Sequence, residues 1–197
     1  KGTQDILDMR RYDAICSAAR THLSRANFTH IQLPVLEYDQ LFKHSVGQHT
    51  DIVTKEMYSF SANGKEVLCL RPEGTAGTMR AFLENKIEDK PWQVFSVGSM
   101  FRHERPQKGR YRQFYQAGIE TYGIPGPDID AEVVAISARL WRLLGLRNVE
   151  LQINSLGSSE ARAAYRDILV AYLTEHESQL DEDSKRRMLS NPLRVLD

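Results

Sequence analysis

The stretch FRHERPQKGRYRQFYQ, residues 101–116, gathers basic side chains in a chain that has no net charge. Four arginines and one lysine lie within residues 102–112, opposed only by Glu104, whereas the whole chain has 26 Lys+Arg and 26 Asp+Glu. Arginine presents a planar fork of donors that fits the oxygens of a phosphate group. The stretch therefore predicts a phosphate-binding site. The alternative is a solvent-exposed β-hairpin with a charged tip.

Residues 110–123 alternate between two kinds of side chain, as the two faces of a strand do. The odd-numbered face is largely apolar and is expected to pack under helices, whereas the even-numbered face carries Phe114, Gln116, Gly118 and Glu120. A plain surface strand favours β-branched residues and salt pairs, so the even face is expected to bind a ligand. Phe114 can stack on a base, and Gln116 and Glu120 suit an ammonium group or a polar amino acid.

The preceding strand, residues 93–102, has the same organisation. Arg102 lies on the face of Ser96 and Gly98, two small residues that leave the floor of this face open. If the open faces of the two strands coincide, one concave surface presents Arg102 beside the aromatic ring, the amide and the carboxylate. The chain has no GxGxxG or GxxxxGK[ST] loop, so we expect any nucleotide to bind on this sheet surface through arginines.

A second stretch, LRPEGTAG at residues 70–77, places Arg71, Glu73 and Thr75 where a strand turns into a helix. Free backbone N–H groups at a helix start can bind an anion, and Glu73 can bind a cation. The alternative is a capped helix start, in which Glu73 and Thr75 only favour the first turn.

The spacing of apolar residues predicts the elements that position these side chains. Helices are expected over residues 8–26, 74–86, 128–145 and 158–173, with Asp128 as N-cap and Gly145 as C-terminal stop of the third, and DEDSKRR as a solvent-facing helical segment. Strands are expected over 29–37 with an interruption at Pro34, over 58–60 and 66–70 around Asn63-Gly64, over 93–102 and 110–123, and over 148–154. Antiparallel hairpins with flanking helices, without regular β-α-β alternation, predict an α+β fold with an antiparallel sheet.

The composition limits the class of protein. The chain has 197 residues, 41% of them hydrophobic, which is enough for one sizeable domain. No apolar run reaches the roughly 18 residues of a membrane span, and the first residues lack the apolar core of a signal peptide, so we expect no membrane partner. Cys16 and Cys69 form no disulfide framework, which favours a reducing cytoplasm. No histidine pair has metal-ligand spacing, so no protein-bound metal is predicted.

The basic stretch, FRHERPQKGRYRQF, resembles motif 2 of the class II aminoacyl-tRNA synthetases in the form found in histidyl-tRNA synthetases. KGTQD, LRPEGTA, GPDIDAE and the closing LDEDSKRRMLSNPLRVLD are similar to bacterial members of that family. The resemblance extends over essentially the whole chain. It implies a class II catalytic core that uses ATP and Mg²⁺ to convert histidine to histidyl-adenylate, and then transfers histidine to the 3′ end of tRNA(His).

The resemblance also implies roles for individual residues toward ATP. Arg102 would be the catalytic arginine, which holds the α-phosphate and the histidine carboxylate during attack. Arg110 would hold the γ-phosphate, Phe114 would stack on adenine, and Glu104 would lie near the adenine or the tRNA acceptor end.

The histidine and tRNA contacts follow from the same resemblance. Glu73, Gly74 and Thr75 would bind the α-amino group of histidine, Gln116 would support the substrate, and Glu120 would meet the imidazole or the ammonium group. Arg105 and Gln107 would contact the acceptor stem of tRNA(His). Pro34, in NFTHIQLPVLE, resembles motif 1, which implies a homodimer through this region.

The family pattern is incomplete in this sequence. Motif 3, a segment like LVRGLDYY, the insertion domain and the anticodon-binding domain are missing from the 197 residues. Residues 1–197 are therefore expected to be the amino-terminal part of a class II catalytic domain, which lacks motif 3 and is impaired when alone.

Three other functions stay open at this point. Histidyl-synthetase-like proteins also serve as non-catalytic regulatory subunits of histidine biosynthesis and as sensors of uncharged tRNA. A regulator that does not bind tRNA would not require Arg105, Gln107 and Lys108. The presence of these residues favours the synthetase. An RNA-binding module with a basic hairpin would not require Glu73 or Glu120.

Overall fold

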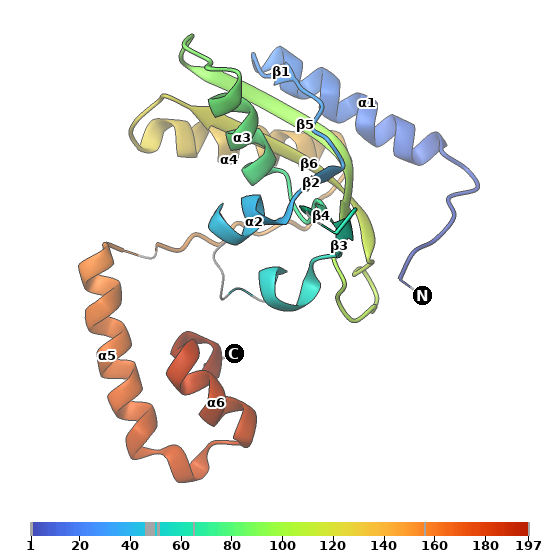
Figure 1. Ribbon diagram of the computed structural model, residues 1–197. Coiled ribbons are helices and arrows are strands. Elements are labelled where there is room, and N and C mark those ends of the chain that lie inside the picture. Colours follow the sequence, from blue (N-terminus) through green and yellow to red (C-terminus); the bar gives the residue numbers. More distant parts are fainter. Residues whose placement is uncertain (1, 46–49, 51, 65, 156, 197) are drawn as a thin grey trace. The chain divides into compact units, whose positions relative to one another are not determined.

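The computed structural model describes residues 2–45, 50, 52–64, 66–155 and 157–196 (Figure 1). The chain divides into two compact units, Lys1–Val149 and Glu150–Asp197. The first unit contains both β-sheets and every predicted site residue. The α+β class predicted from the sequence is confirmed.

The central sheet of the first unit has the strand order β1-β5-β6. Strands β5 (Trp92–Phe101) and β6 (Gln113–Tyr122) form the predicted long antiparallel hairpin, and they stay in register from Trp92 opposite Tyr122 to Phe101 opposite Gln113. The short strand β1 (Thr29–His30) pairs with β5 in parallel, which the sequence did not predict.

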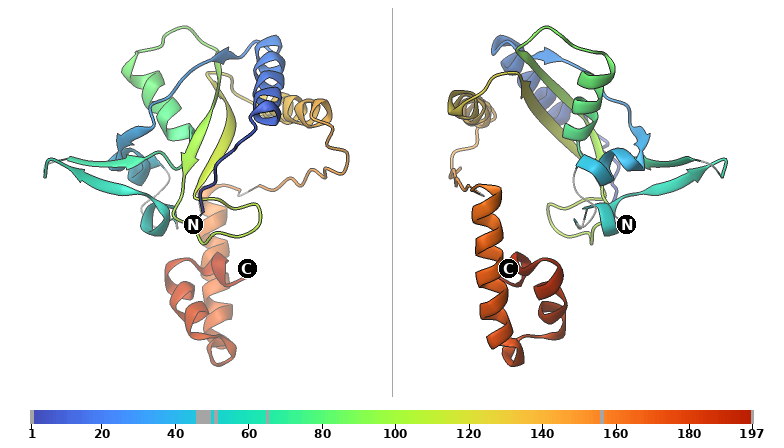
Figure 2. Two further views of the ribbon diagram at one scale, coloured as in Figure 1. Left: turned by 90° about the vertical axis from the view of Figure 1, so that its right-hand side faces the viewer. Right: turned by 60° about the vertical axis from the view of Figure 1, so that its left-hand side comes forward.

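A second sheet has the order β2-β4-β3 and is antiparallel throughout. It consists of β2 (Leu36–Tyr38), β3 (Ser59–Ala62) and β4 (Glu66–Leu70). The last two strands project together from the unit (Figure 2). Asn63 and Gly64 both have positive φ, at 53° and 73°, as the predicted tight turn between these strands requires. Pro34 separates β1 from β2, so the segment predicted as one interrupted strand serves two sheets.

Helices α1 (Arg10–Arg25) and α4 (Pro127–Leu143) cover the apolar face of the central sheet. The core on this side contains Leu23, Phe28, Phe95 and Ile136, with Val97 and Ile119 packed against it. The odd-numbered residues Phe95, Val97 and Ile119 therefore lie under helices, as expected. Helix α3 (Thr75–Glu84) contacts β6 and contributes its first turn to the even-numbered face.

The ends of α4 differ in how well the sequence predicted them. The helix begins at Pro127 after Gly126, so the prediction of Asp128 as N-cap is wrong and Asp128 lies in the first turn. Proline is favoured at this position because its missing N–H would have no helical partner there. Gly145, with φ of 80°, is confirmed as the stop. The N–H of Leu146 donates to the carbonyl of Trp141, which completes a Schellman motif.

Two further helical segments lie between β2 and β3 in the chain. The short helix α2 (Asp39–Ser45) buries Phe42 completely, and a single π-helical turn covers Ile52–Glu56. Neither segment was predicted, because seven and five residues are too short to show a helical period.

The second unit is helical. Helices α5 (Ser159–Glu175) and α6 (Glu182–Ser190) and the 3₁₀ turns Glu177–Gln179 and Pro192–Val195 enclose a small core of Leu169, Leu173 and Met188. The predicted strand over 148–154 is wrong, because these residues pair with no strand in the described part of the chain and Ile153 is 81% exposed. No helix within the described ranges is long and apolar enough to cross a membrane.

Candidate functional site

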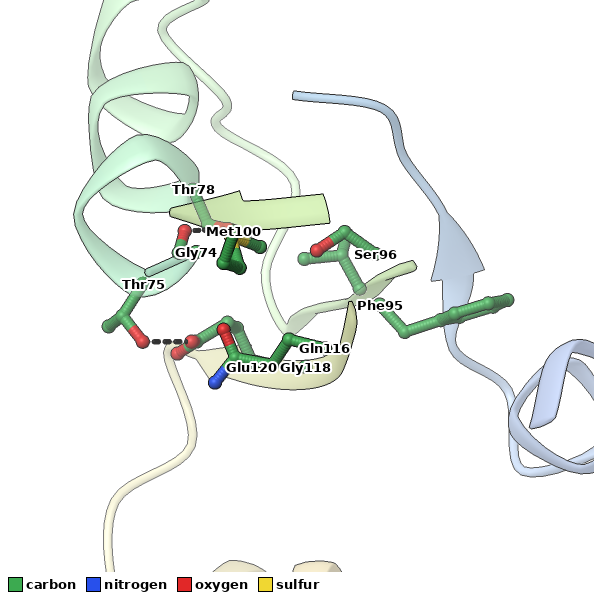
Figure 3. Close-up of a pocket in the computed structure, with 10 residues that line it drawn as sticks. Gly74, Thr75, Thr78, Phe95, Ser96, Met100, Gln116, Gly118 and Glu120 are labelled. Atoms are coloured by element: carbon green, nitrogen blue, oxygen red, sulfur yellow. Dashed lines mark hydrogen bonds between the residues drawn. The ribbon is translucent and has the colours of Figure 1, made fainter. Parts of the chain in front are cut away.

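The open faces of β5 and β6 coincide, as the alternation predicted. Their register places Ser96 opposite Gly118 and Val94 opposite Glu120. Together with the start of α3, these faces surround a cavity (Figure 3). Its lining is Gly74, Thr75, Thr78, Val94, Phe95, Ser96, Met100, Gln116, Gly118 and Glu120. Four predicted histidine-binding residues, Gly74, Thr75, Gln116 and Glu120, therefore converge on one cavity.

The side chain of Glu73, which precedes α3, caps the start of this helix. The Glu73 carboxylate accepts hydrogen bonds from the N–H groups of Thr75, at 2.6 Å, and Ala76, at 2.9 Å. These N–H groups are therefore not available to an external anion, and the prediction of an anion site at this helix start is wrong. The helix start is capped by Glu73, as the alternative predicted for this residue, whereas Thr75 also bonds to β6.

The Thr75 hydroxyl links α3 to β6. It donates to Glu120 Oε1 at 2.6 Å (Figure 3). Burial raises the pKa of the Glu120 carboxyl, the Thr75 hydrogen bond offsets part of this rise, and the charge of Glu73 adds to it. Burial also raises the pKa of Tyr122 to about 12, with further contributions from Glu120 and Glu73. The Glu120 carboxylate lines the cavity and the charge of Glu73 acts on it, whereas the described lining residues include no lysine or arginine, so the site favours a cation.

Gln116 presents an unsatisfied acceptor. Its Oε1 atom is buried and has no hydrogen-bond partner in the described part of the chain. A buried acceptor without a partner costs about 1–3 kcal/mol, so a donor from a ligand in the cavity would be stabilised here. Figure 3 shows Gln116 beside Glu120 on β6.

Arg102 and Phe114 contact each other on the same hairpin but are not among the residues that line this cavity, although the sequence predicted one surface that they share with Gln116 and Glu120. The guanidinium carbon of Arg102 lies 5.2 Å from the centroid of the Phe114 ring, within the range of a cation–π contact. Arg102 Nε donates to the carbonyl of Pro72 at 2.9 Å, whereas its two Nη groups make no hydrogen bond among the described residues. The forked edge of the guanidinium is thus available to an anion.

The loop between β5 and β6 carries the remaining predicted contacts. Glu104 and Arg110 form an ion pair at 3.5 Å. A tight turn joins Gln107 to Arg110, where the N–H of Arg110 donates to the Gln107 carbonyl at 2.9 Å. Arg105 and Gln107 are exposed. The structure therefore does not bring Arg110 or Glu104 to the cavity, and it places Arg105 and Gln107 at an open tip.

Gly98 does not leave the face of the sheet open, contrary to the prediction. The guanidinium of Arg71 lies over it, and a Cβ atom at residue 98 would collide with Arg71 Nη2. Arg71 is only 7% exposed, and its Nε donates to the carbonyl of Ser99 at 2.9 Å. Gly98 therefore makes room for an internal arginine and does not line the cavity.

A family model described as "Histidyl-tRNA synthetase" matches residues 2–177. The chain belongs to the histidyl-tRNA synthetase family. A histidine–tRNA ligase of Hydrogenovibrio crunogenus is 57% identical over 187 residues, which are 94% of this chain and 44% of that protein. The chain thus spans less than half the length of this relative.

Solved structures agree with the assignment. Apo histidyl-tRNA synthetase of S. aureus is 31% identical with a TM-score of 0.75, over 99% of this chain and 47% of that one. An "ATP phosphoribosyltransferase regulatory subunit/histidyl-tRNA synthetase" from Bacillus halodurans is 21% identical with a TM-score of 0.69, over 95% of this chain and 53% of that one. The latter likeness shows the fold alone. The predicted class II catalytic fold is confirmed.

Two residues that line the cavity were missed by sequence reasoning. Met100 is buried and lines the cavity from β5, and Thr78 lines it from α3. The even-numbered position of Met100 on β5 was a signal for the first, whereas only the helical spacing from Thr75 points to the second. Among the described residues there is no group of three or more His, Cys, Asp or Glu side chains that could hold a metal ion.

Proposed function

We propose that this chain contributes the histidine pocket and part of the ATP site of an enzyme that converts histidine and ATP to histidyl-adenylate and then transfers histidine to the 3′ end of tRNA(His). The observation that carries the proposal is the linked pair of Thr75 and Glu120 beside the unsatisfied Gln116 Oε1. A half-buried carboxylate and a buried amide oxygen together accept from a ligand that carries an ammonium group and further N–H donors, as histidine does.

The histidine ammonium group meets Glu73 and Gln116, close to Gly74 and Thr75 at the start of α3. Glu120 accepts from the imidazole or from the ammonium group. The Glu73 carboxylate is held by the amides of α3, so it offers a fixed charge to the ligand. A preorganised carboxylate costs little reorganisation when the substrate binds.

Arg102 and Phe114 serve the ATP half of the reaction. A carboxylate oxygen of histidine attacks the α-phosphorus, the new P–O bond forms, and the bond to pyrophosphate breaks. Negative charge grows on the phosphoryl oxygens, and the open fork of Arg102 stabilises it. Phe114 offers its ring to adenine. The carboxylate is already ionised at neutral pH, so this step needs no general base.

Mg²⁺ suits this site only as a companion of ATP. Magnesium that accompanies a nucleotide is held mainly by phosphates and water, with one or two protein carboxylates. The described residues supply no cluster of three ligands, so they fit such an arrangement and not a dedicated protein site. When bound, the ion neutralises phosphate charge. Arg110 is the proposed partner of the γ-phosphate, which requires that Arg110 separate from Glu104. Glu104 is proposed to lie near the adenine or the acceptor end of the tRNA.

The macromolecular contacts are part of the same proposal. Arg105 and Gln107, exposed at the loop tip, contact the acceptor stem of tRNA(His). The region around Pro34 forms a homodimer, which is supported by the exposed apolar side chains of Leu36, at 49%, and Tyr38, at 55%, on β2. Residues 1–197 form part of the catalytic domain, and the cytoplasm is the compartment of the reaction.

Histidine-dependent ATP–pyrophosphate exchange, measured on a chain extended through motif 3, tests the proposal. By analogy with the loss of one preorganised donor, Arg102→Ala is expected to lower exchange by about 10²–10³-fold, roughly 3–4 kcal/mol. Arg142→Ala, which changes an exposed arginine on α4, is the control and is expected to retain exchange. Unchanged exchange in Arg102→Ala contradicts the role of this residue. Histidine binding without any exchange would favour the regulatory alternative.

A further inference from the structure

The N-terminal segment, residues 2–9, bonds to the root of the loop between β5 and β6, the point where Arg102 and Arg112 face each other. The Arg112 carbonyl accepts from the N–H of Arg102 at 2.9 Å, and the N–H of Arg112 donates to the carbonyl of Gly2 at 2.7 Å. Both backbone groups of Arg112 are therefore bonded, one on each side. The segment runs from α1 to this root as the dark blue coil in Figure 2.

Gly2 fits this place because it has no side chain. Residues 3–9 are exposed, whereas Gly2 is partly buried. Its φ of 92° is one that side-chain-bearing residues rarely adopt. A Cβ atom on residue 2 would lie 2.7 Å from Arg112 Cγ, 2.8 Å from Arg112 Cδ and 3.1 Å from Pro106 Cγ. The two closest atoms belong to the inner part of the Arg112 side chain, so they cannot move without displacing that whole side chain.

The Arg112 side chain carries this packing into the loop. From its position against Gly2 it reaches the backbone of Glu104, whose carbonyl accepts from Arg112 Nε at 3.2 Å. The Glu104 carboxylate in turn pairs with Arg110 at 3.5 Å. Displacement of the Arg112 side chain would therefore release the backbone of Glu104, and with it a pair of residues that are proposed to serve ATP.

The other side of the loop root is bonded to the body of the first unit. The N–H of His103 donates to the carbonyl of Glu56 at 2.6 Å, and the side chain of Arg102 is oriented by its bond to the carbonyl of Pro72. Gly2 is the backbone partner that the structure places on the β6 side of the root. The two ends of the loop are thus held by segments that are far apart in the sequence.

We propose that the N-terminal segment is a positioning element for ATP, in which Gly2 holds Arg112 and thereby sets the loop that carries Glu104 and Arg110. This inference rests on the proposed ATP contacts of those two loop residues. A loop with an anchored root loses less conformational freedom when the phosphates bind, so the anchor lowers KM for ATP. The histidine pocket is expected to be independent of the segment, because Arg112 and Pro106 are not among the described residues that line that cavity.

Gly2→Ala is the test variant, and Gly64→Ala is the matched control. Both replace a glycine of positive φ, at 92° and 73°, but a Cβ on residue 64 would have no neighbour within 4 Å. Pyrophosphate exchange is measured on the chain extended through motif 3. KM for ATP is expected to rise about fivefold in Gly2→Ala relative to Gly64→Ala, as for the loss of one hydrogen bond. KM for histidine is expected to be equal in the two variants.

Arg112→Ala removes both of the crowded side-chain atoms, so a double-mutant cycle isolates the contact with Gly2. In the Arg112→Ala background, Gly2→Ala is expected to change KM for ATP by no more than about twofold, the range of independent sites. A rise that persists undiminished in this background would mean that Gly2 does not act through Arg112.

Limited trypsin cleavage after Lys108 and Arg110 reports release of the loop without any activity. Cleavage follows the population of the open loop, so it is expected to be about fivefold faster in Gly2→Ala than in Gly64→Ala. The inference is overturned if the two variants agree in loop cleavage or in KM for ATP, or if Gly2→Ala raises KM for histidine as much as KM for ATP.

The same experiment separates this inference from the proposed function. Exchange by the wild-type chain with equal cleavage of the two variants retains the enzyme and removes the positioning role of Gly2. Absent exchange by the wild-type chain refutes the proposed enzyme. Faster cleavage of Gly2→Ala then still supports the hold of Gly2 on the loop, and equal cleavage overturns it.

Discussion

The Thr75 hydroxyl donates to Glu120 Oε1 at 2.6 Å, although the two residues lie 45 positions apart in the sequence. This bond joins the first turn of α3 to the second half of β6 and fixes one oxygen of the half-buried carboxylate. The second oxygen of Glu120 is left for a ligand. The hydrogen bond between these two residues therefore determines the orientation of the Glu120 carboxylate in the cavity.

Thr75→Val tests this link, because valine keeps the shape of the side chain and removes the hydroxyl. A hydrogen bond to a charged group contributes about 1.5–3 kcal/mol, so KM for histidine in pyrophosphate exchange is expected to rise roughly 10- to 150-fold. Thr21→Val, at an exposed position on α1, is the control. An equal KM for the two variants would show that Thr75 has no part in histidine binding.

The two faces of the β5–β6 hairpin were predictable from sequence. A strand has a period of two, and small or polar residues at Ser96, Gly118 and Glu120 stand out from the apolar residues between them. The hairpin register then brings the two open faces together without further information. The convergence of Gln116 and Glu120 on one cavity follows from local pattern alone.

Contacts between distant segments were not predictable in this way. The sequence around Gly98 does not reveal that Arg71, from another strand, fills the space above this glycine. Nor does the order of residues decide whether Glu73 bonds to its own helix or to a ligand. The alternation in residues 148–154 suggested a strand, but a strand requires a partner, and alternation alone does not supply one.

Gly98→Ala is expected to destabilise the protein, because the new Cβ would displace the Arg71 guanidinium from its carbonyl partners. Overpacking of a buried site costs about 1–3 kcal/mol, measured as a lower free energy of unfolding in urea. Gly118→Ala is the matched control on the neighbouring strand and the same face, where a Cβ would have no neighbour within 4 Å. Equal stability of the two variants would contradict the proposed crowding.

Phe114→Leu is expected to raise KM for ATP and to leave histidine binding nearly unchanged. Stacking of a base on an aromatic ring contributes about 1–3 kcal/mol, which corresponds to a rise of roughly 5- to 150-fold. Tyr115→Leu is the control, since Tyr115 points to the opposite face and contacts Tyr12 at a centroid distance of 4.7 Å. If both variants raise KM for ATP equally, the effect arises from the strand and not from the stacked ring.

The raised pKa of Glu120 predicts a pH dependence of stability with an unusual sign for a carboxylate. Since its pKa in the folded protein lies above the unfolded value of about 4.3, the folded state binds more protons within the interval between the two pKa values. This carboxyl therefore favours folding below that interval, and its contribution declines as the pH rises through it. Glu120→Gln removes the titration.

The measurement is urea unfolding of wild type and Glu120→Gln at a series of pH values from acid to neutral. The free energy of unfolding of wild type, minus that of the variant, is expected to fall with increasing pH and then level off above the folded pKa. All other titrating groups contribute nearly equally to both proteins and cancel in this difference. A difference that is flat or rises with pH would mean that burial does not control Glu120, and the cavity would then lack the desolvated carboxylate on which its preference for a cation depends.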